Sequence, residues 1–479
     1  MKNIFIKSLI FVFTIGFLTS CEDKLDQIPF DEFGTENAFV SASDFENGIR
    51  GVYANLVSGG LYGSSDNGSI LTAADVLSDN VTLATVGNGR LTKRYLHEYT
   101  YNVNITMSTM YSNAYSLIFR ANQILQFAEA FDGQNKANIV AEAKALRALA
   151  HFHVVTFWGK IPTQSADANS GLGVAYLFEA DPNVEPARNT VGEVYGFIVD
   201  DLTDAARDIN ESNPDARMGK DAVNLLLSRV YLYMGQWQNS INAANQVSTP
   251  VAERDGFVGI WDDSTVSDNG LIFSIENVNP ILNIQIGTAW NQGVPQALIA
   301  EYVASKELVD LYKEDDIRKE AYIFDATTSG NDLKAIRKLF GREGENDGVV
   351  DYKIFRASEA SLNRAEAHFR LNQSAQALAA LNEVRTERYL NPADGESGNA
   401  LLSAIKLERR LEFAFEYQRF LDIKRYGESV QREAFGDIAD GSGTPSVPLL
   451  LEAGSFRFQM PLGQRTLDTN PNAQQNPGY

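Results

Sequence analysis

The fold class is decided by residues 139–162, which read IVAEAKALRALAHFHVVTFWGKIP. Apolar side chains recur there at steps of three and four residues, as expected for one face of an α-helix. Trp158-Gly159-Lys160-Ile161-Pro162 ends the pattern, and the alanines allow a neighbouring helix to approach closely. The stretch therefore predicts a long helix packed among other helices, with a buried face made of Ile139, Ala143, Leu146, Ala150, Val154 and Phe157.

Further helices are predicted on both sides of this stretch. Helical patterns cover residues 41–56, about 107–130, a segment capped by Thr190, and 401–426. Residues 220–246 indicate a helical hairpin broken near Gly235-Gln236, and part of this pattern returns at 364–384. Such an echo is typical of tetratricopeptide-type hairpins, although any two antiparallel amphipathic helices share these features. The prediction is a mainly α fold built on helix pairs.

Composition and charge restrict the class of partner. Hydrophobic residues make up 44% of the 479 residues, which is enough for a sizeable core. The chain carries 41 basic and 62 acidic residues, a net charge of −21. A nucleic-acid binder needs a basic face to displace counterions from phosphates, so nucleic acid is not an expected partner. Neutral ligands such as sugars suit this charge better.

The N-terminus predicts export and a lipid anchor. Residues 1–20 start with two lysines, continue through an apolar run and end in small residues, which is the pattern of a secretory signal peptide. Cys21, the only cysteine, follows Leu18-Thr19-Ser20 and resembles the lipobox of bacterial lipoproteins. The resemblance implies cleavage before Cys21 and acylation of its thiol. The alternatives are a plain signal peptide and a buried thiol.

The sequence offers no motif for catalysis or for a cofactor. His151 and His153 are two residues apart on a helix and therefore face different sides. The His-Glu-x-x-His, Gly-x-Ser-x-Gly and phosphate-loop patterns do not occur. Residues 343–348 resemble the start of a calcium loop, but Ile354 occupies the position of its closing glutamate. We therefore expect a binding protein without cofactor, metal or catalytic residues.

Carboxylates are numerous, and two interpretations of them stay open. Glycoside hydrolysis needs two carboxylates placed across a sugar, and spacing along the chain cannot establish that relation. The densest set lies at three- and four-residue steps, which predicts ion pairs along one helix; it comprises Glu408, Arg409, Arg410, Glu412, Glu416, Arg419, Asp422 and Arg425.

Two loop-rich stretches, 58–106 and 276–297, are expected to supply the ligand site, because loops on a rigid scaffold commonly bind ligands. Residues 250–297 form a loop-rich insertion with one strand-like run at 271–275. A Trp or Tyr platform beside amides and carboxylates suits a sugar. For any one aromatic, the alternative is that it folds back onto the scaffold. The candidate ligand-binding residues are Trp290, Asn291, Tyr62, Asp79, Asn80, Tyr99 and Tyr101.

Several motifs together resemble the SusD/RagB family of outer-membrane nutrient-binding lipoproteins. They are Ala141 to Ala148 with Trp158 to Pro162, Arg364 to Ala367 with Leu381 to Arg385, Glu408 to Glu412 with Arg419 to Arg425, and the ending Pro461 to Tyr479. The resemblance spans the chain from Cys21 to Tyr479. Its signature residues are mostly scaffold, so no ligand-binding residue carries over.

The resemblance implies a fold, a partner and a place in the cell. It implies tetratricopeptide-like helix pairs that support a loop-rich binding face, in one domain over 21–479. Within that domain we expect an N-terminal part at about 21–225, the insertion at about 250–297 and a C-terminal part at about 298–479. It also implies a lipid-anchored protein on the outside of the outer membrane. There it would pass oligosaccharides, or peptides in the RagB branch, to a SusC-like TonB-dependent transporter.

Overall fold

The computed structural model describes residues 39–57, 60–63, 69–86, 89–214, 217–265, 269–277, 284–393 and 395–479. The predicted signal peptide and Cys21 lie outside these residues. The predicted mainly α class is confirmed, because long helices dominate and the strands are short. Within the described part of the chain, no helix combines the length and the apolar character needed to cross a membrane.

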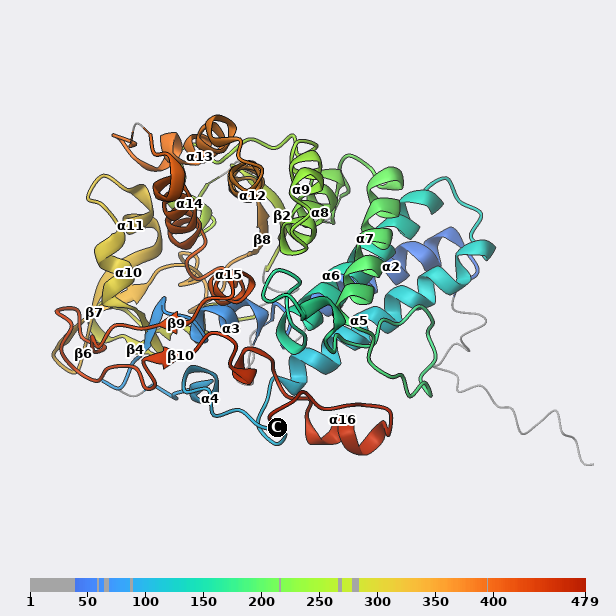
Figure 1. Cartoon of the computed structure of the whole chain (residues 1–479), viewed down its shortest axis with the longest axis horizontal. Helices are drawn as coiled ribbons and strands as arrows, with labels where there is room; N and C mark the ends of the chain where they lie inside the picture. Colours follow the sequence, from blue (N-terminus) through green and yellow to red (C-terminus); the bar gives the residue numbers. More distant parts are fainter. Residues whose placement is uncertain are drawn as a thin grey trace, which may run out of the picture.

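A row of packed helices forms the scaffold. Each helix of the row packs against the next, and α14 contacts both α12 and α13. Figure 1 shows the row running from α2 at the right to α13 and α14 at the upper left. In chain order its members are α2 (Ala42–Leu56), α5 (Ser108–Phe127), α6 (Lys136–Trp158), α7 (Val191–Asp208), α8 (Lys220–Tyr233), α9 (Trp237–Ala244), α12 (Ser358–Arg370), α13 (Ser374–Arg388) and α14 (Gly398–Glu412).

Helix α6 corresponds to the stretch that decides the fold class, and it is buried along most of its length between α5 and α7. His151 and His153 point to different neighbours, as their spacing predicts. The His151 ring stacks on Tyr176 with centroids 3.7 Å apart, whereas His153 Nε2 lies 2.6 Å from the hydroxyl of Tyr62. Burial lowers the pKa of His151 to about 3 and holds that of His153 well below its usual value, so both imidazoles are neutral side chains within the fold.

The two predicted hairpins lie next to each other. Helix α8 pairs with α9, α12 pairs with α13, and α9 packs against α12. A buried ion pair joins them, because Nε and Nη2 of Arg229 each donate to Glu359 at 2.5 Å. Asn363 adds a hydrogen bond to Ser228 Oγ at 3.2 Å. The pattern shared by 220–246 and 364–384 therefore corresponds to neighbouring helix pairs.

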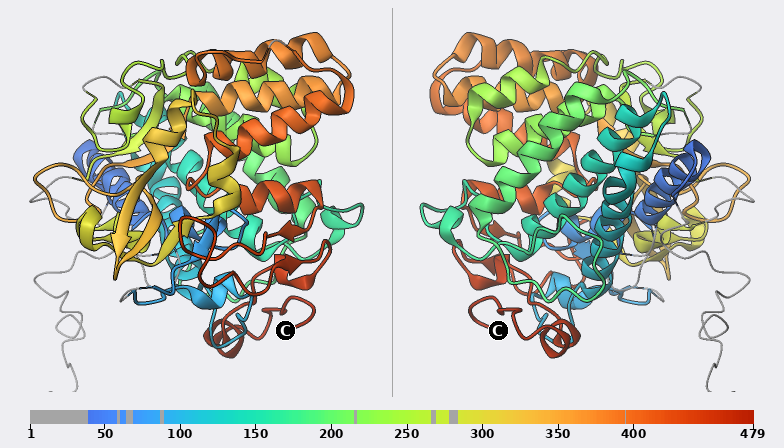
Figure 2. Two further views of the ribbon diagram at one scale, coloured as in Figure 1. Left: turned by 90° about the vertical axis from the view of Figure 1, so that its left-hand side faces the viewer. Right: turned by 90° about the vertical axis from the view of Figure 1, so that its right-hand side faces the viewer.

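Short antiparallel strand pairs and short helices form the other end of the molecule, opposite α2 (Figures 1 and 2). The strand predicted at 271–275 is present as β2, and its pairing with β8 ties the insertion to the C-terminal part. The pairs are β1 (Val81–Leu83) with β5 (Tyr302–Ala304), β2 (Leu271–Ile275) with β8 (Tyr352–Arg356), β3 (Asn291–Gln292) with β4 (Ile299–Ala300), β6 (Ile323–Thr328) with β7 (Asn331–Ile336), and β9 (Val430–Gln431) with β10 (Leu450–Leu451).

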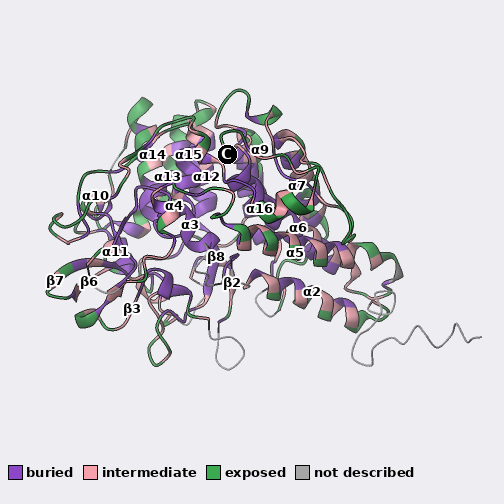
Figure 3. Ribbon diagram, turned by 90° about the horizontal axis from the view of Figure 1, so that it is seen from below, coloured by how far each residue is buried: buried purple, intermediate pink, exposed green. Residues whose placement is uncertain are grey.

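The short helices are α3 (Ile70–Val76), α4 (Arg94–His97), α10 (Lys306–Leu311), α11 (Ile317–Tyr322) and α15 (Arg419–Tyr426). A further short helix, α16 (Gln464–Thr469), lies below α5 in Figure 1, near the C-terminus. One large apolar core extends from α2 through the end with the strand pairs to the C-terminal tail. A smaller core lies between α12, α13 and α14. Figure 3 shows the buried residues concentrated in the interior of the view, with exposed residues toward its rim.

The helix predicted at 401–426 is wrong as a single element. Helix α14 ends at Glu412 and α15 begins at Arg419. Between them Phe415 and Tyr417 adopt positive φ angles of 66° and 57°. The buried Asp75 carboxylate accepts hydrogen bonds from both of their backbone N–H groups, at 3.0 and 3.1 Å. The break is therefore held by a side chain from the other end of the sequence.

The ion pairs predicted along this helix are also mostly wrong. Asp422 and Arg425 do pair at 2.7 Å within α15. Glu412, in contrast, is fully buried and pairs with Arg356 on β8 at 2.8 Å and Arg388 on α13 at 2.9 Å. Burial opposes its charge, but these guanidinium groups hold the pKa of Glu412 well below its usual value. These charges pair between elements because the surrounding elements exclude water from them.

Candidate functional site

The structure places Trp290 and Asn291 in the core. Trp290 is 0% exposed and packs edge-on against Tyr302 and Phe415, with ring centroids 6.0 and 6.1 Å away. Asn291 is also buried, and its Nδ2 donates to the Ile336 carbonyl at 2.9 Å. The sequence hypothesis of an exposed platform at 290–291 is therefore corrected, because the β3–β4 hairpin turns this segment inward.

The three tyrosines proposed as ligand contacts are core residues as well. Besides the Tyr62–His153 contact, the Tyr99 hydroxyl donates to the Leu77 carbonyl at 2.6 Å, and the Tyr101 hydroxyl donates to the carbonyl of Arg457. All three rings are buried. Their hydroxyls satisfy backbone or imidazole groups inside the fold, so they present no aromatic face to a ligand in this structure.

Asp79 and Asn80 lie together, but they bind arginine side chains of the protein itself and not a ligand. The Asp79 carboxylate accepts from Arg419 Nε and Nη2, both at 2.7 Å, and lies 3.3 Å from Arg410. Asn80 Oδ1 accepts from Arg410 Nε at 3.0 Å. Burial opposes the charge of Asp79, but the two arginines hold its pKa well below the usual value. These residues fix α14 and α15 against β1.

An open groove lies instead between the start of α5 and the C-terminal segment. Two hollows of about 730 and 190 Å³ adjoin there and share Tyr111, Tyr115 and Thr466. We call them together the tyrosine groove. One wall is residues 103–112, the other is 462–473 with α16, and the smaller hollow extends along 175–188. Its polar lining includes Asn104, Ser108, Thr109, Ser112, Gln464 and Thr469.

The position of the two tyrosines follows from local helix geometry. Residues four apart on a helix share a face, so Tyr111 and Tyr115 stand together, with ring centroids 4.8 Å apart. Tyr111 packs edge-on against Trp158, and the Tyr115 hydroxyl donates to the Ala175 carbonyl at 2.8 Å. Both rings are half-buried. They provide a fixed aromatic surface beside neutral hydroxyl and amide groups.

The sequence did not identify this groove. The three- and four-residue period marks Tyr111 and Tyr115 as part of a helical stripe, which is the pattern of core residues. Their other wall lies more than three hundred residues later, in a tail without a clear period. The only available signal was the pair of tyrosines at the start of a helix, beside a run of Asn, Ser and Thr.

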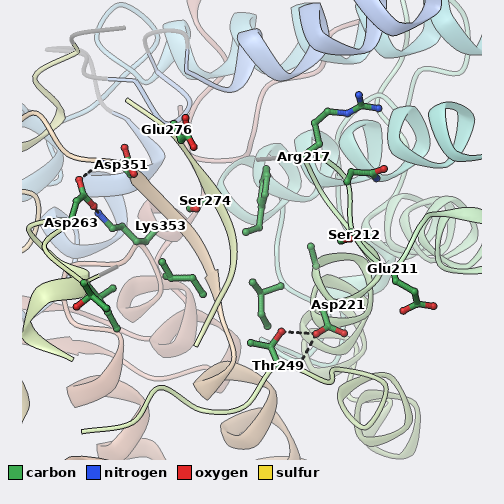
Figure 4. A pocket seen from close by; sticks show the side chains of 18 of the residues that line it. Glu211, Ser212, Arg217, Asp221, Thr249, Asp263, Ser274, Glu276, Asp351 and Lys353 are labelled. Atoms are coloured by element: carbon green, nitrogen blue, oxygen red, sulfur yellow. Dashed lines mark hydrogen bonds and ion pairs between the residues drawn. The ribbon is translucent and has the colours of Figure 1, made fainter. Parts of the chain in front are cut away.

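A separate hollow, of about 510 Å³, lies apart from the tyrosine groove, between β2 and the start of α8 (Figure 4). We call it the β2 cleft. Figure 4 shows Asp263, Asp351 and Lys353 on one side and Asp221 with Thr249 on the other. Asp263 pairs with Lys353 and with Arg342, the latter at 2.6 Å. Although burial opposes its charge, these cations hold the pKa of Asp263 below its usual value.

The β2 cleft offers less to a sugar than the tyrosine groove. Phe273, the one aromatic among the described residues that line it, is 2% exposed. Asp221 already accepts from Ser248 and Thr249. Across the described ranges, no group of three or more His, Cys, Asp and Glu side chains is placed to hold a metal ion.

Comparison with known proteins gives two family matches and many relatives. A model described as the SusD family matches residues 336–479, and a model described as starch-binding associating with outer membrane matches residues 32–232. The chain is 22% identical to SusD-like protein P25 of Formosa agariphila over 97% of this chain and 96% of that protein.

Solved structures share the fold over nearly their whole length. A SusD superfamily protein from Bacteroides thetaiotaomicron has a TM-score of 0.79 and 23% identity, covering 91% of this chain and 100% of that one. A SusD-like carbohydrate binding protein from Bacteroides vulgatus has a TM-score of 0.78 and 20% identity, covering 91% and 98%. These structures show the shared fold, while the two family matches at 32–232 and 336–479 together cover most of the chain, which therefore belongs to the SusD/RagB family.

Proposed function

We propose that this protein binds a glycan in the tyrosine groove. The observation that carries the proposal is a pair of half-buried tyrosine rings at the edge of an open hollow lined by neutral hydroxyls and amides. Sugars present apolar C–H faces with hydroxyl rims, so an aromatic surface beside hydrogen-bonding groups complements them. Carbohydrate binding by a relative of the same fold supports this choice.

We propose a binding role rather than hydrolysis. In the β2 cleft, the carboxylates Asp263 and Asp351 already pair with Arg342, and Asp221 is held by hydroxyls. A glycosidase needs one carboxyl group free to protonate the leaving oxygen, and the described residues that line the tyrosine groove include no carboxylate. Family membership and the lipobox-like Cys21 further support a lipoprotein of the outer membrane that passes its ligand to a SusC-like TonB-dependent transporter.

A glycan array of neutral, uronate-containing and sulfated polysaccharides, run beside a peptide library, tests the class of ligand. We expect binding on the array and none in the library. Turnover of a polysaccharide by the purified protein, or binding to peptides alone, would contradict the proposal. Calorimetry with the best array ligand then tests the site.

Two groove variants locate the binding. Tyr111→Ala should weaken glycan affinity by ~1–3 kcal/mol, the scale of one good aromatic contact, and Ser112→Trp should block the hollow by bulk. Thr203→Trp on the exposed face of α7 is the steric control, and Ser274→Trp fills the β2 cleft instead. Loss of binding with Ser274→Trp but not with Ser112→Trp would move the site to the β2 cleft.

Anchoring and delivery need separate tests. Cys21→Ala should release the protein from membranes, because it removes the thiol that would be acylated, and should leave the glycan affinity of the purified protein unchanged. Mass spectrometry of the N-terminal peptide should show an acylated Cys21. Co-purification of a TonB-dependent barrel with the wild-type protein tests the transporter partnership. An unmodified Cys21 would refute the anchor, whatever the ligand.

A further inference from the structure

The tyrosine groove has a charge opposite to that of the whole chain. Among the described residues that line its two hollows none is acidic, and Arg188 and Arg465 are the charged ones. The chain as a whole has 62 acidic residues and a net charge of −21. A groove free of carboxylates is therefore a local departure from the composition of the surface.

Arg188 is a cation without a carboxylate partner. Its guanidinium donates to four backbone carbonyls: Gly173 at 2.7 Å, Trp158 and Gln474 at 3.0 Å, and Leu172 at 3.4 Å. No ion pair joins it to an acidic side chain of the described part. Carbonyl oxygens satisfy N–H groups but do not neutralise the charge of this half-buried arginine. Burial lowers the pKa of Arg188, as expected for a charge that lacks compensation.

Arg465 supplies a second, accessible cation on the opposite wall. It is exposed on α16, and no carboxylate of the described residues forms an ion pair with it. The nearest acidic side chain on its own helix, Asp468, instead accepts from Gln464 Nε2 at 2.8 Å. A guanidinium matches the paired oxygens of a carboxylate or a sulfate with parallel N–H groups. Two arginines that form no ion pair with a described carboxylate therefore line the hollows that Tyr111 and Tyr115 share.

We infer that the ligand of the tyrosine groove is an anionic glycan, one that carries uronic acid carboxylates or sulfate esters. The inference rests on the proposed function and narrows its substrate class. The rings take the apolar sugar faces, Arg465 binds the anionic group directly, and Arg188 provides a fixed positive charge beneath it. The acid-free lining removes the repulsion that the chain's net charge would otherwise impose on such a ligand.

Matched ligand pairs test the charge without changing the sugar backbone. One pair is oligogalacturonate and its methyl ester; the other is a carrageenan oligosaccharide and its desulfated form. Calorimetry at low and at high sodium chloride measures each affinity. We expect the charged member of at least one pair to bind about tenfold tighter at low salt, with the preference shrinking at high salt as charges are screened. The two pairs separate carboxylate from sulfate.

Variants assign the preference to the groove. Arg465→Gln should remove most of the preference and Arg465→Lys should restore part of it, while Arg120→Gln is the matched control. Arg120 is an exposed arginine on α5 outside the groove lining, so the control removes the same charge. Equal binding of charged and neutral forms, or equal effects of Arg465→Gln and Arg120→Gln, would overturn the inference.

The outcomes distinguish this inference from the proposed function. If array ligands are all neutral but Tyr111→Ala still weakens their binding, the anionic preference is wrong and glycan binding stands. If no glycan of either charge binds, or if the groove variants leave binding unchanged, the proposed function fails first. Acidic ligands on the array that lose affinity in Arg465→Gln support both.

Discussion

Trp290 fills the core between Tyr302 and Phe415, and its indole Nε1 meets no hydrogen-bond acceptor among the described residues. Tyr111, a smaller aromatic on a regular helix, keeps part of its ring in the groove. In the sequence, the size of Trp290 and its polar loop suggested a ligand contact, and the helical period of Tyr111 suggested a core residue. At the residue scale, the direction in which the local backbone turns decides whether an aromatic residue binds ligand or fills the core.

Replacing Trp290 should therefore damage stability and leave binding intact. Trp290→Ala removes a fully buried indole, and such truncations cost ~3–5 kcal/mol. Trp290→Phe should cost less, because no hydrogen bond of Nε1 is lost. Denaturant unfolding and calorimetry on the folded fraction measure the two effects. A stable Trp290→Ala protein with weakened glycan affinity would restore Trp290 to the binding site.

Glu366 gives a pH dependence whose sign is fixed by its partners. Its two carboxylate oxygens accept from Arg425 at 2.7 and 2.6 Å, and Tyr426 adds a third bond at 2.9 Å. Burial opposes the charge, but Arg425 lowers the pKa of Glu366 from 4.5 to about 2. A carboxyl group with a depressed folded-state pKa stabilises the protein above its unfolded pKa.

The free energy of unfolding should thus fall as the pH drops from about 4.5 to about 2. Glu366→Gln should lose ~3 kcal/mol at neutral pH, because Asp422 is then the one carboxylate among the described residues that still pairs with Arg425. The variant should also flatten this acidic limb. Urea unfolding across the window measures both. Arg364→Gln, a change at the partly exposed neighbouring turn of α12, is the control. An unchanged slope in Glu366→Gln would show that other carboxylates dominate acid unfolding.

At the scale of elements, periodicity predicted most helices but not how they pair. Residues 41–56, 139–157 and 220–246 became α2, α6 and the α8–α9 hairpin because each has a clear apolar face and an end signal. The break between α14 and α15 could not be predicted, since Asp75, some 340 positions earlier, holds it. The tyrosine groove could not be predicted from the sequence for the same reason, because its two walls are distant in the sequence and meet only in the folded protein.

The Arg229–Glu359 pair should act as the joint between the two hairpins. Removing one partner leaves a buried charge, so Glu359→Leu and Arg229→Met should each cost ~3–5 kcal/mol. The double variant Arg229→Met with Glu359→Leu should cost clearly less than the sum, because no charge is left unpaired. Denaturant unfolding of the four proteins closes the cycle. Additive losses would mean that the two side chains act independently.

At the scale of the whole molecule, the C-terminal tail closes the fold onto α6. Asn476 Nδ2 donates to the carbonyls of Trp158 and Met460 at 2.8 and 2.7 Å, and Trp158 Nε1 donates to the Pro461 carbonyl at 3.0 Å. The side-chain amide of Gln475 bonds to both backbone groups of Leu462: its Oε1 accepts from the Leu462 N–H and its Nε2 donates to the Leu462 carbonyl. The tail thereby sets the position of α16, which forms one wall of the groove.

Breaking this contact should reduce stability and binding together. Asn476→Ala removes the donor of the Met460 carbonyl and one of the two donors of the Trp158 carbonyl, and should cost ~1–3 kcal/mol. Deletion of residues 471–479 should also abolish glycan binding. Asn472→Ala, in the exposed part of the tail, is the matched control. Melting temperature and calorimetric affinity are the measurements. A deletion protein that binds glycan normally would show that α16 holds its place without the tail.

The closure by the C-terminal tail means that the two walls of the tyrosine groove are synthesised at different times. Synthesis proceeds from the N-terminus, so Tyr111 and Tyr115 are made early and wait for a wall that includes Gln464 and Thr469. A nascent or prematurely terminated chain possesses the aromatic surface but no groove. If the tyrosine groove is the binding site, as we propose, ligand binding is the last property the polypeptide acquires, because the wall at 462–473 is synthesised last.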